Sequence, residues 1–230
     1  MNRSVLVFFL TILSFATCPF FCLAAELQTN STYSADVPKW VTKGRIDRTT
    51  DRIQSFMEWD IHRVTVVWYK DQASFEKAHG LGPSVLAVSR KNENKILVGP
   101  KVNADNFDKI FGHELTHVIS YQKYKDAIPR WLEEGLANYV AKNGNPDYKW
   151  LASKPFPKDV RDLTHPFSGD AESLRYHYEA SQALVEMIAK KCDLRNLLRL
   201  SVGQKMESYL DTYCQIKDLN ASYQKWIKSH

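Results

Sequence analysis

The segment at positions 113–117 reads His-Glu-Leu-Thr-His, a spacing that can build a metal centre. On a helix, His113 and His117 project from one face, so both imidazoles can reach the same ion. Glu114 lies between them with its carboxylate free for general-base work. A carboxylate from a second helix would complete a zinc site that keeps one position open for water, and Glu134 follows the second histidine by seventeen positions. This combination of residues predicts hydrolytic chemistry.

The helix that must carry the two histidines is predicted to begin near Asn103 or Asp105, either of which can cap it. Its apolar residues have the spacing of a buried helical face: Phe107, Ile110, Phe111, Leu115, Val118 and Ile119. The histidines lie on the flank of this stripe, as a metal site that faces a cleft requires. Two structural histidines that bind no metal are the alternative.

The remaining elements are predicted from hydrophobic period and turn residues. A second helix from Arg130 to about Lys142 would carry Glu134. Before the motif we expect helices at 46–59 and 72–79, a strand at 64–69, and a hairpin formed by 85–89 and 95–98. The strand at 95–98 is expected to be the sheet edge that pairs with an extended peptide.

The first 24 residues have the order of a secretory signal peptide. A positively charged start is followed by an apolar run at 5–16, Pro19, and small residues that place cleavage near Ala24 or Ala25. An uncleaved membrane anchor is the alternative. Cleavage would leave no membrane span and an extracytoplasmic protein, periplasmic or secreted. Residues 25–43 are polar and without a pattern, and we expect them to form a loose lead-in.

Charge and cysteine content narrow the class of protein. The chain has 31 basic and 26 acidic residues, and loss of Arg3 with the leader leaves a net charge near +4, from 30 − 26. This mild charge, without a basic block, argues against nucleic-acid binding. Cleavage also leaves two cysteines, Cys192 and Cys214, which are expected to form a disulfide in an oxidising compartment. Two buried free thiols are the alternative.

The two motif segments, His-Glu-Leu-Thr-His and Trp-Leu-Glu-Glu-Gly-Leu-Ala at 131–137, resemble those of the gluzincin metallopeptidases. The resemblance is to compact peptidase MA-like domains and, more distantly, to the aminopeptidase and thermolysin families. It implies a zincin-like α+β fold over residues 44–230, with a small N-terminal mixed lobe that holds a sheet and the active-site helix, and a helical C-terminal lobe. It also implies one zinc ion, with Glu134 as the third ligand. Glu133 stays open as the alternative ligand, because the spacing from His117 is short.

The same resemblance suggests two supporting residues. Asn138 lies where thermolysin-like sequences have an aspartate that orients the first histidine, and its amide oxygen could accept the same hydrogen bond. Tyr178 matches a tyrosine near the start of a later helix that stabilises the oxyanion, with Tyr176 and His177 as neighbouring candidates. The alternatives are a surface asparagine and a tyrosine that only packs.

These expectations combine into a zinc peptidase that acts on a peptide or protein substrate, with endopeptidase activity favoured. The loop region at 143–175 is expected to form the wall that selects substrate. Two other functions stay open: a non-catalytic domain that keeps the gluzincin fold, and an envelope protein that acts on one specific partner. The sequence predicts neither the oligomeric state nor the cleavage specificity.

Overall fold

The computed structural model describes residues 26–142, 144–164 and 170–230. Within these ranges the fold is α+β, with a five-stranded mixed sheet in the order β1-β2-β3-β5-β4. The strands are β1 (Leu27–Gln28), β2 (Thr32–Ser34), β3 (Val64–Trp68), β4 (Ala87–Arg90) and β5 (Lys95–Val98). The α-helices are α1 (Lys43–Met57), α2 (Gln72–His79), α3 (Phe107–Tyr124), α4 (Arg130–Ala141), α5 (Tyr148–Ala152), α6 (Ala171–Lys191), α7 (Leu194–Leu200), α8 (Glu207–Thr212) and α9 (Leu219–Lys228). Two 3-10 helices are η1 (Lys91–Glu93) and η2 (Val160–Asp162).

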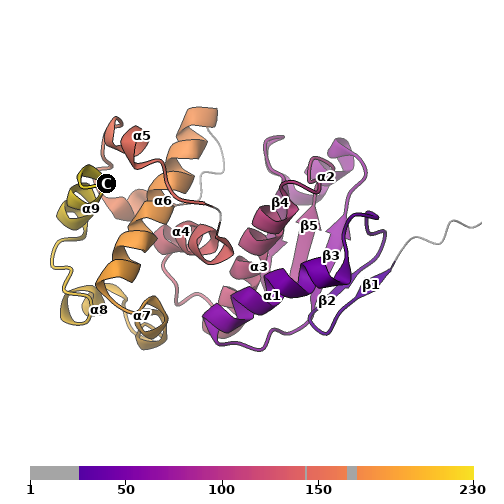
Figure 1. Cartoon of the computed structure of the whole chain (residues 1–230), viewed down its shortest axis with the longest axis horizontal. Helices are drawn as coiled ribbons and strands as arrows, with labels where there is room; N and C mark the ends of the chain where they lie inside the picture. The colour runs from indigo at the N-terminus through magenta and orange to yellow at the C-terminus, as the bar shows by residue number, and fades with distance from the viewer. Residues whose placement is uncertain (1–25, 143, 165–169) are drawn as a thin grey trace, which may run out of the picture.

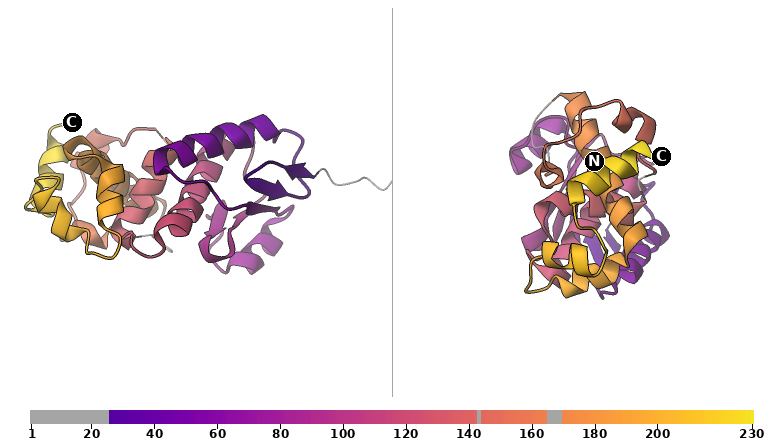
Figure 2. Two further views of the ribbon diagram at one scale, coloured as in Figure 1. Left: turned by 90° about the horizontal axis from the view of Figure 1, so that it is seen from below. Right: turned by 90° about the vertical axis from the view of Figure 1, so that its left-hand side faces the viewer.

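The elements divide into two parts that meet at α3 and α4. The sheet gathers with α1 and α2 at one end of the molecule, and α5–α9 gather at the other (Figure 1). The same division is seen from below, where α1 runs along the part that contains the sheet (Figure 2). One continuous apolar core joins both parts, so the two motif helices lie where the sheet and the helical region pack together.

The strand positions correct the prediction of the sheet edge. β5 pairs in parallel with β3 and antiparallel with β4, so it lies inside the sheet. Ile96, Leu97 and Val98 are buried, as an inner strand requires. The hairpin itself is confirmed, but its edge strand is β4. A hairpin pattern indicates that two strands pair and leaves open which of them meets the rest of the sheet, because that depends on contacts distant in sequence.

The lead-in prediction for residues 25–43 is wrong. β1 and β2 lie in this segment, and β2 pairs in parallel with β3. Ser34 donates from Oγ to the Val66 carbonyl (3.0 Å) and accepts from the Trp68 indole (2.8 Å). β2 itself is held by backbone pairing and short polar side chains, so it carries no hydrophobic period by which a strand is recognised.

Helix ends follow local capping. α2 has the predicted bounds, because the Asp71 side chain accepts from the Ser74 amide and Gly80 ends the helix with φ 70°. α1 begins at Lys43, three residues earlier than predicted, because the Thr42 hydroxyl accepts from the Arg45 amide (3.3 Å). The predicted signal peptide at 1–24 lies outside the described residues.

The disulfide prediction is confirmed. Cys192 and Cys214 are joined with a Cα–Cα distance of 4.9 Å, which ties the end of α6 to the segment after α8. The bridged cysteines are 22 positions apart, and for a loop of this length chain entropy predicts about 3 kcal/mol of stabilisation. No helix in the described part of the chain is long and apolar enough to cross a membrane.

A backbone contact between α4 and α6 depends on Gly135. A Cβ placed at this position would lie 2.0 Å from the Ser181 carbonyl oxygen and 2.8 Å from a methyl group of Val185. The two helices therefore approach more closely than any side chain at position 135 allows. Glu134 is the neighbouring residue on α4. The close contact between α4 and α6 therefore also constrains where the Glu134 carboxylate lies relative to α3.

Substitution of Gly135 by alanine should destabilise the fold by about 3 kcal/mol or more, because backbone atoms of α6 must move. The measurement is the free energy of unfolding in denaturant. Gly44→Ala is the control, since its Cβ would meet only the Arg48 guanidinium at 3.7 Å and alanine favours helix by up to about 1 kcal/mol. Equal stability of Gly135→Ala and the wild type would contradict the close contact.

Candidate metal centre

Helix α3 presents the two motif histidines from the flank of its apolar face. Phe107, Phe111, Leu115, Val118 and Ile119 are buried in the core, as the period predicts. The helix begins at Phe107, later than predicted, because Asn103 serves the preceding turn. Its side-chain oxygen accepts from the Asp105 amide (2.9 Å) and the Asn106 amide (3.3 Å). The start of the helix therefore shifts while the face that carries the histidines is as expected.

His113, His117 and Glu134 converge on one point. The two Nε2 atoms lie 3.1 Å apart, His113 Nε2 lies 3.3 Å from Glu134 Oε2, and His117 Nε2 lies 3.4 Å from Glu134 Oε1. His117 and Glu134 are buried and His113 is nearly so. Three groups that can each offer a lone pair would repel one another in this place unless a cation or proton lies between them. This cluster could hold a metal ion.

The outward-facing nitrogen of His113 contacts Asn138, the residue predicted to orient it. The distance from His113 Nδ1 to Asn138 Oδ1 is 2.8 Å. An amide oxygen can only accept, so Nδ1 carries the proton and Nε2 presents its lone pair to the cluster. Asn138 is buried one turn after Glu134 on α4. The candidate ligand Glu134 and the residue that contacts His113 Nδ1 therefore come from the same helix.

Glu133, the alternative third ligand, lies on the other side of His117. Its Oε1 is 3.5 Å from His117 Nδ1, the ring nitrogen that points away from the cluster, and 2.6 Å from Lys91 Nζ. The two neighbouring glutamates therefore have different positions: Glu134 faces the two Nε2 atoms and Glu133 faces the back of one imidazole. Sequence reasoning did not single out Lys91, which lies 42 residues before Glu133 and carries no motif.

Electrostatics in the cluster favour a positive charge. Burial alone would lower the pKa of His117, but the charges of Glu134, Glu133 and Glu114 outweigh it and raise this pKa to about 9. Burial would likewise raise the pKa of Glu133, whereas His117 and Lys91 lower it to about 2. The same negative potential that holds a proton on His117 in the metal-free protein attracts a metal cation.

Two further predicted residues lie beside the cluster. Glu114 follows His113 on α3 and is half-buried. Tyr178 is on α6, two turns inside the helix, with its ring centre 6.2 Å from that of His113. Burial raises the pKa of Tyr178, and the charges of Glu134 and Glu114 raise it further, so the phenol stays protonated and can donate a hydrogen bond. The neighbouring Tyr176 instead donates to the Pro155 carbonyl (3.0 Å).

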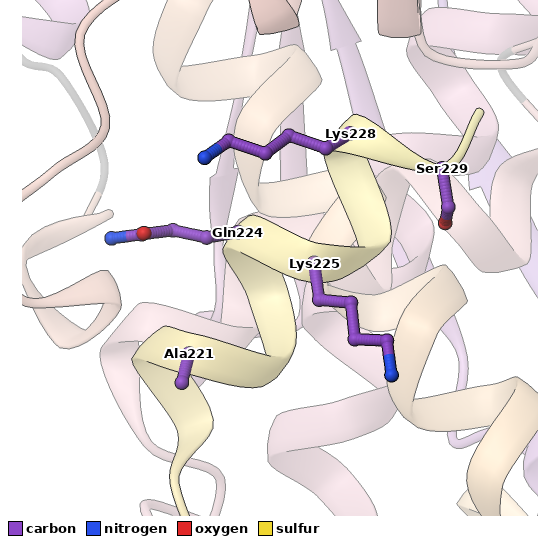
Figure 3. Close-up of a pocket in the computed structure, with 5 residues that line it drawn as sticks. All are labelled: Ala221, Gln224, Lys225, Lys228 and Ser229. Atoms are coloured by element: carbon purple, nitrogen blue, oxygen red, sulfur yellow. The ribbon is translucent and has the colours of Figure 1, made fainter.

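One surface hollow of the described chain lies in another region. It is lined by Ala221, Gln224, Lys225, Lys228 and Ser229. All five side chains come from α9 and the residue that follows it (Figure 3). A hollow on the side of one helix has no facing wall, and it contains none of the residues of the cluster.

A scan of known protein families finds no model that matches this chain, and a search of curated proteins finds no match.

Replacing His113 or Glu134 by alanine should abolish metal binding. Loss of a partner that only orients a ligand already lowers metal affinity about 10–100-fold, and loss of a ligand should exceed that. Elemental analysis after dialysis should give about one metal ion per wild-type chain and none in either variant. His62→Ala, which removes a histidine outside the cluster, should keep the wild-type content. A full metal content in Glu134→Ala would rule out this set of ligands.

Metal affinity should rise with pH, because metal and proton compete for His117. With a pKa of about 9 in the metal-free protein, His117 carries a proton at neutral pH that must leave on ligation. One released proton changes the apparent affinity by about tenfold per pH unit below that pKa. Competition with a chelator between about pH 6 and pH 8 measures the slope. An affinity that is independent of pH would contradict the assignment of His117.

The raised pKa of His117 also determines how the stability of the metal-free protein changes with pH. The pKa of His117 is raised above the ordinary value of 6.5, so its charged form stabilises the folded state. This stabilisation is fully present below pH 6.5 and is lost as the pH rises through about 9.

Proposed function

We propose that this protein is a zinc-dependent peptidase of the gluzincin type. The observation that supports it most is the convergence of His113 Nε2, His117 Nε2 and Glu134, with pairwise distances of 3.1, 3.3 and 3.4 Å. A carboxylate that could act as a base, Glu114, lies next to the first ligand in sequence. Two histidines and one carboxylate are a ligand set of hydrolytic zinc sites. A nearby carboxylate that does not bind the metal can serve as the general base.

The ligand types in the cluster favour zinc over larger cations. The two Nε2 atoms lie 3.1 Å apart, near the separation of about 3.3–3.4 Å between ligand atoms held about 2.0–2.1 Å from a tetrahedral ion. Mixed imidazole and carboxylate ligation also suits zinc better than calcium or magnesium, which prefer oxygen ligands. When bound, zinc lowers the pKa of a water molecule to about 7 and polarises a carbonyl group.

The residues of the chain supply the proton transfers. Glu114 would accept a proton from the water whose oxygen attacks the amide carbon, and would give it to the leaving nitrogen as the C–N bond breaks. The Tyr178 phenol would donate a hydrogen bond to the carbonyl oxygen as negative charge develops there. Its protonated state suits this role, because a phenolate could only accept. Asn138 would keep the His113 lone pair directed inward.

The substrate would extend along β4. In the described chain β4 pairs with β5 alone, so its other edge offers backbone groups to an extended peptide. α3 packs directly against β4, which brings this edge beside the motif helix. An extended substrate favours cleavage within a chain, and we therefore propose endopeptidase activity. The region at 144–164 that follows α4 would contribute the wall of the site.

We place the enzyme outside the cytoplasm and assign it a zincin-like fold. The disulfide is compatible with an oxidising compartment, and the order of residues 1–24 is typical of a cleaved signal peptide. The gluzincin resemblance implies an N-terminal lobe with a sheet and the active-site helix, followed by a helical lobe, and a sheet region that packs against α3 next to a helical region agrees with it.

Substitution of Glu114 by glutamine should remove activity while zinc is retained. General acid–base groups contribute about 10²–10⁴-fold to rate, so turnover should fall by that factor. The measurement is digestion of a peptide library with and without chelator, together with zinc content. Glu207→Gln, an exposed carboxylate on α8, is the control and should match the wild type. Equal turnover in Glu114→Gln and the wild type would point to a different base, whereas a zinc-loaded wild type without turnover would favour a non-catalytic protein.

A further inference from the structure

A chain of polar contacts links the hairpin of the sheet to the back of the metal cluster. Lys91 is in η1, between β4 and β5, and its Nζ lies 2.6 Å from Glu133 Oε1. The same oxygen lies 3.5 Å from His117 Nδ1. Lys91, Glu133 and His117 come from three different elements: the hairpin, α4 and α3. One carboxylate oxygen therefore joins the edge hairpin to a proposed metal ligand.

The Lys91–Glu133 ion pair differs from an ordinary surface pair because its carboxylate also faces the imidazole of His117. The Lys91 and Glu133 side chains are 33% and 21% exposed, so neither is free to sample solvent fully. Glu133 has three side-chain torsions, and an ammonium group on one oxygen restricts them. A restricted carboxylate at Nδ1 fixes the tautomer and ring plane of an imidazole, which tunes the other nitrogen as a ligand.

The turn of the hairpin is also anchored to α3 at a second point. Gln122 donates from Nε2 to Asn94 Oδ1 (2.9 Å), just beyond η1. The Lys91 ammonium also lies 5.6 Å from the ring centre of Tyr121, the preceding residue on α3. The hairpin is thus held against the motif helix, and Lys91 is the point at which this contact reaches the cluster.

We infer that Lys91 is a positioning residue for the metal centre. Through Glu133 it holds His117 in its ligating orientation, so metal affinity and the order of the β4–β5 hairpin depend on each other. The inference depends on the proposed metal site but not on peptidase activity. The contacts from Lys91 to Glu133 and from Glu133 to His117 connect the hairpin that contains the edge strand β4, where a peptide would bind, to a proposed metal ligand.

The test compares zinc affinity in Lys91→Met, Lys91→Arg and Lys95→Met. Lys91→Met keeps the apolar stem and should weaken zinc binding about 10–100-fold in chelator competition. Lys91→Arg keeps the charge and should restore most of the affinity. Lys95 pairs with Glu93 in the same hairpin (2.9 Å) and is similarly exposed, so Lys95→Met is the matched control and should bind as the wild type does.

Three readouts separate positioning from a general loss of stability. The visible spectrum of the Co²⁺ protein should change in Lys91→Met and return in Lys91→Arg. Zinc should slow hydrogen exchange of the β4–β5 amides in the wild type and not in Lys91→Met. In a double-mutant cycle for zinc affinity with Glu133→Gln, the Lys91→Met change should add little, because both substitutions break one contact.

Wild-type affinity in Lys91→Met, or an equal loss in Lys95→Met, would overturn the inference and leave the metal site intact. Additive effects of Lys91→Met and Glu133→Gln would overturn it as well. A wild-type protein that binds no zinc would overturn both the metal site and this inference. Zinc binding by the wild type is therefore measured first, which separates this outcome from the others. Should Lys91→Met fail to fold, Lys91→Gln takes its place, with an expected loss of zinc affinity that Lys91→Arg does not show.

Discussion

The backbone contact between α4 and α6 at Gly135 is the constraint on which the candidate site depends. α4 lies between α3 and α6, and its Gly135 meets the Ser181 carbonyl where no side chain fits. Glu134 precedes this contact by one residue and Tyr178 precedes Ser181 by three. The same close approach therefore sets how far the carboxylate reaches toward the α3 histidines and how near the phenol stands. Gly135 permits this close approach, and the candidate ligand and the candidate hydrogen-bond donor lie beside it.

Burial of several charges in one place is the second constraint. Two imidazole nitrogens and a carboxylate within 3.4 Å of one another are costly to desolvate without a positive charge among them. A proton on His117 supplies that charge in the metal-free protein, as its raised pKa indicates. A divalent cation would supply more. Asn138 and Glu133 contact the outer nitrogens of the two rings, so each imidazole is oriented from behind. The cluster is thus prepared for a cation by contacts that do not touch the cation.

Local signals in the sequence predicted much of the fold and of the site. Hydrophobic period and turn residues located α2, α3, α4 and the β4–β5 hairpin, although the predicted caps of α3 were wrong. The two motif segments brought His113, His117 and Glu134 together as expected. The failures share a cause. β1 and β2 are held by pairing with β3, the edge position of β4 follows from the order of the whole sheet, and the Lys91–Glu133 contact joins residues 42 positions apart. Each of these depends on contacts between distant segments, which no local pattern records.

The central claim is that one zinc ion is held by these three side chains. Crystals of the zinc-loaded protein, with diffraction measured on both sides of the zinc absorption edge, test it directly. The account predicts one strong anomalous peak within bonding distance, about 2.0–2.2 Å, of His113 Nε2, His117 Nε2 and a Glu134 oxygen. A peak bound to Glu133 instead of Glu134, a peak at another site, or no peak in zinc-loaded crystals would contradict it.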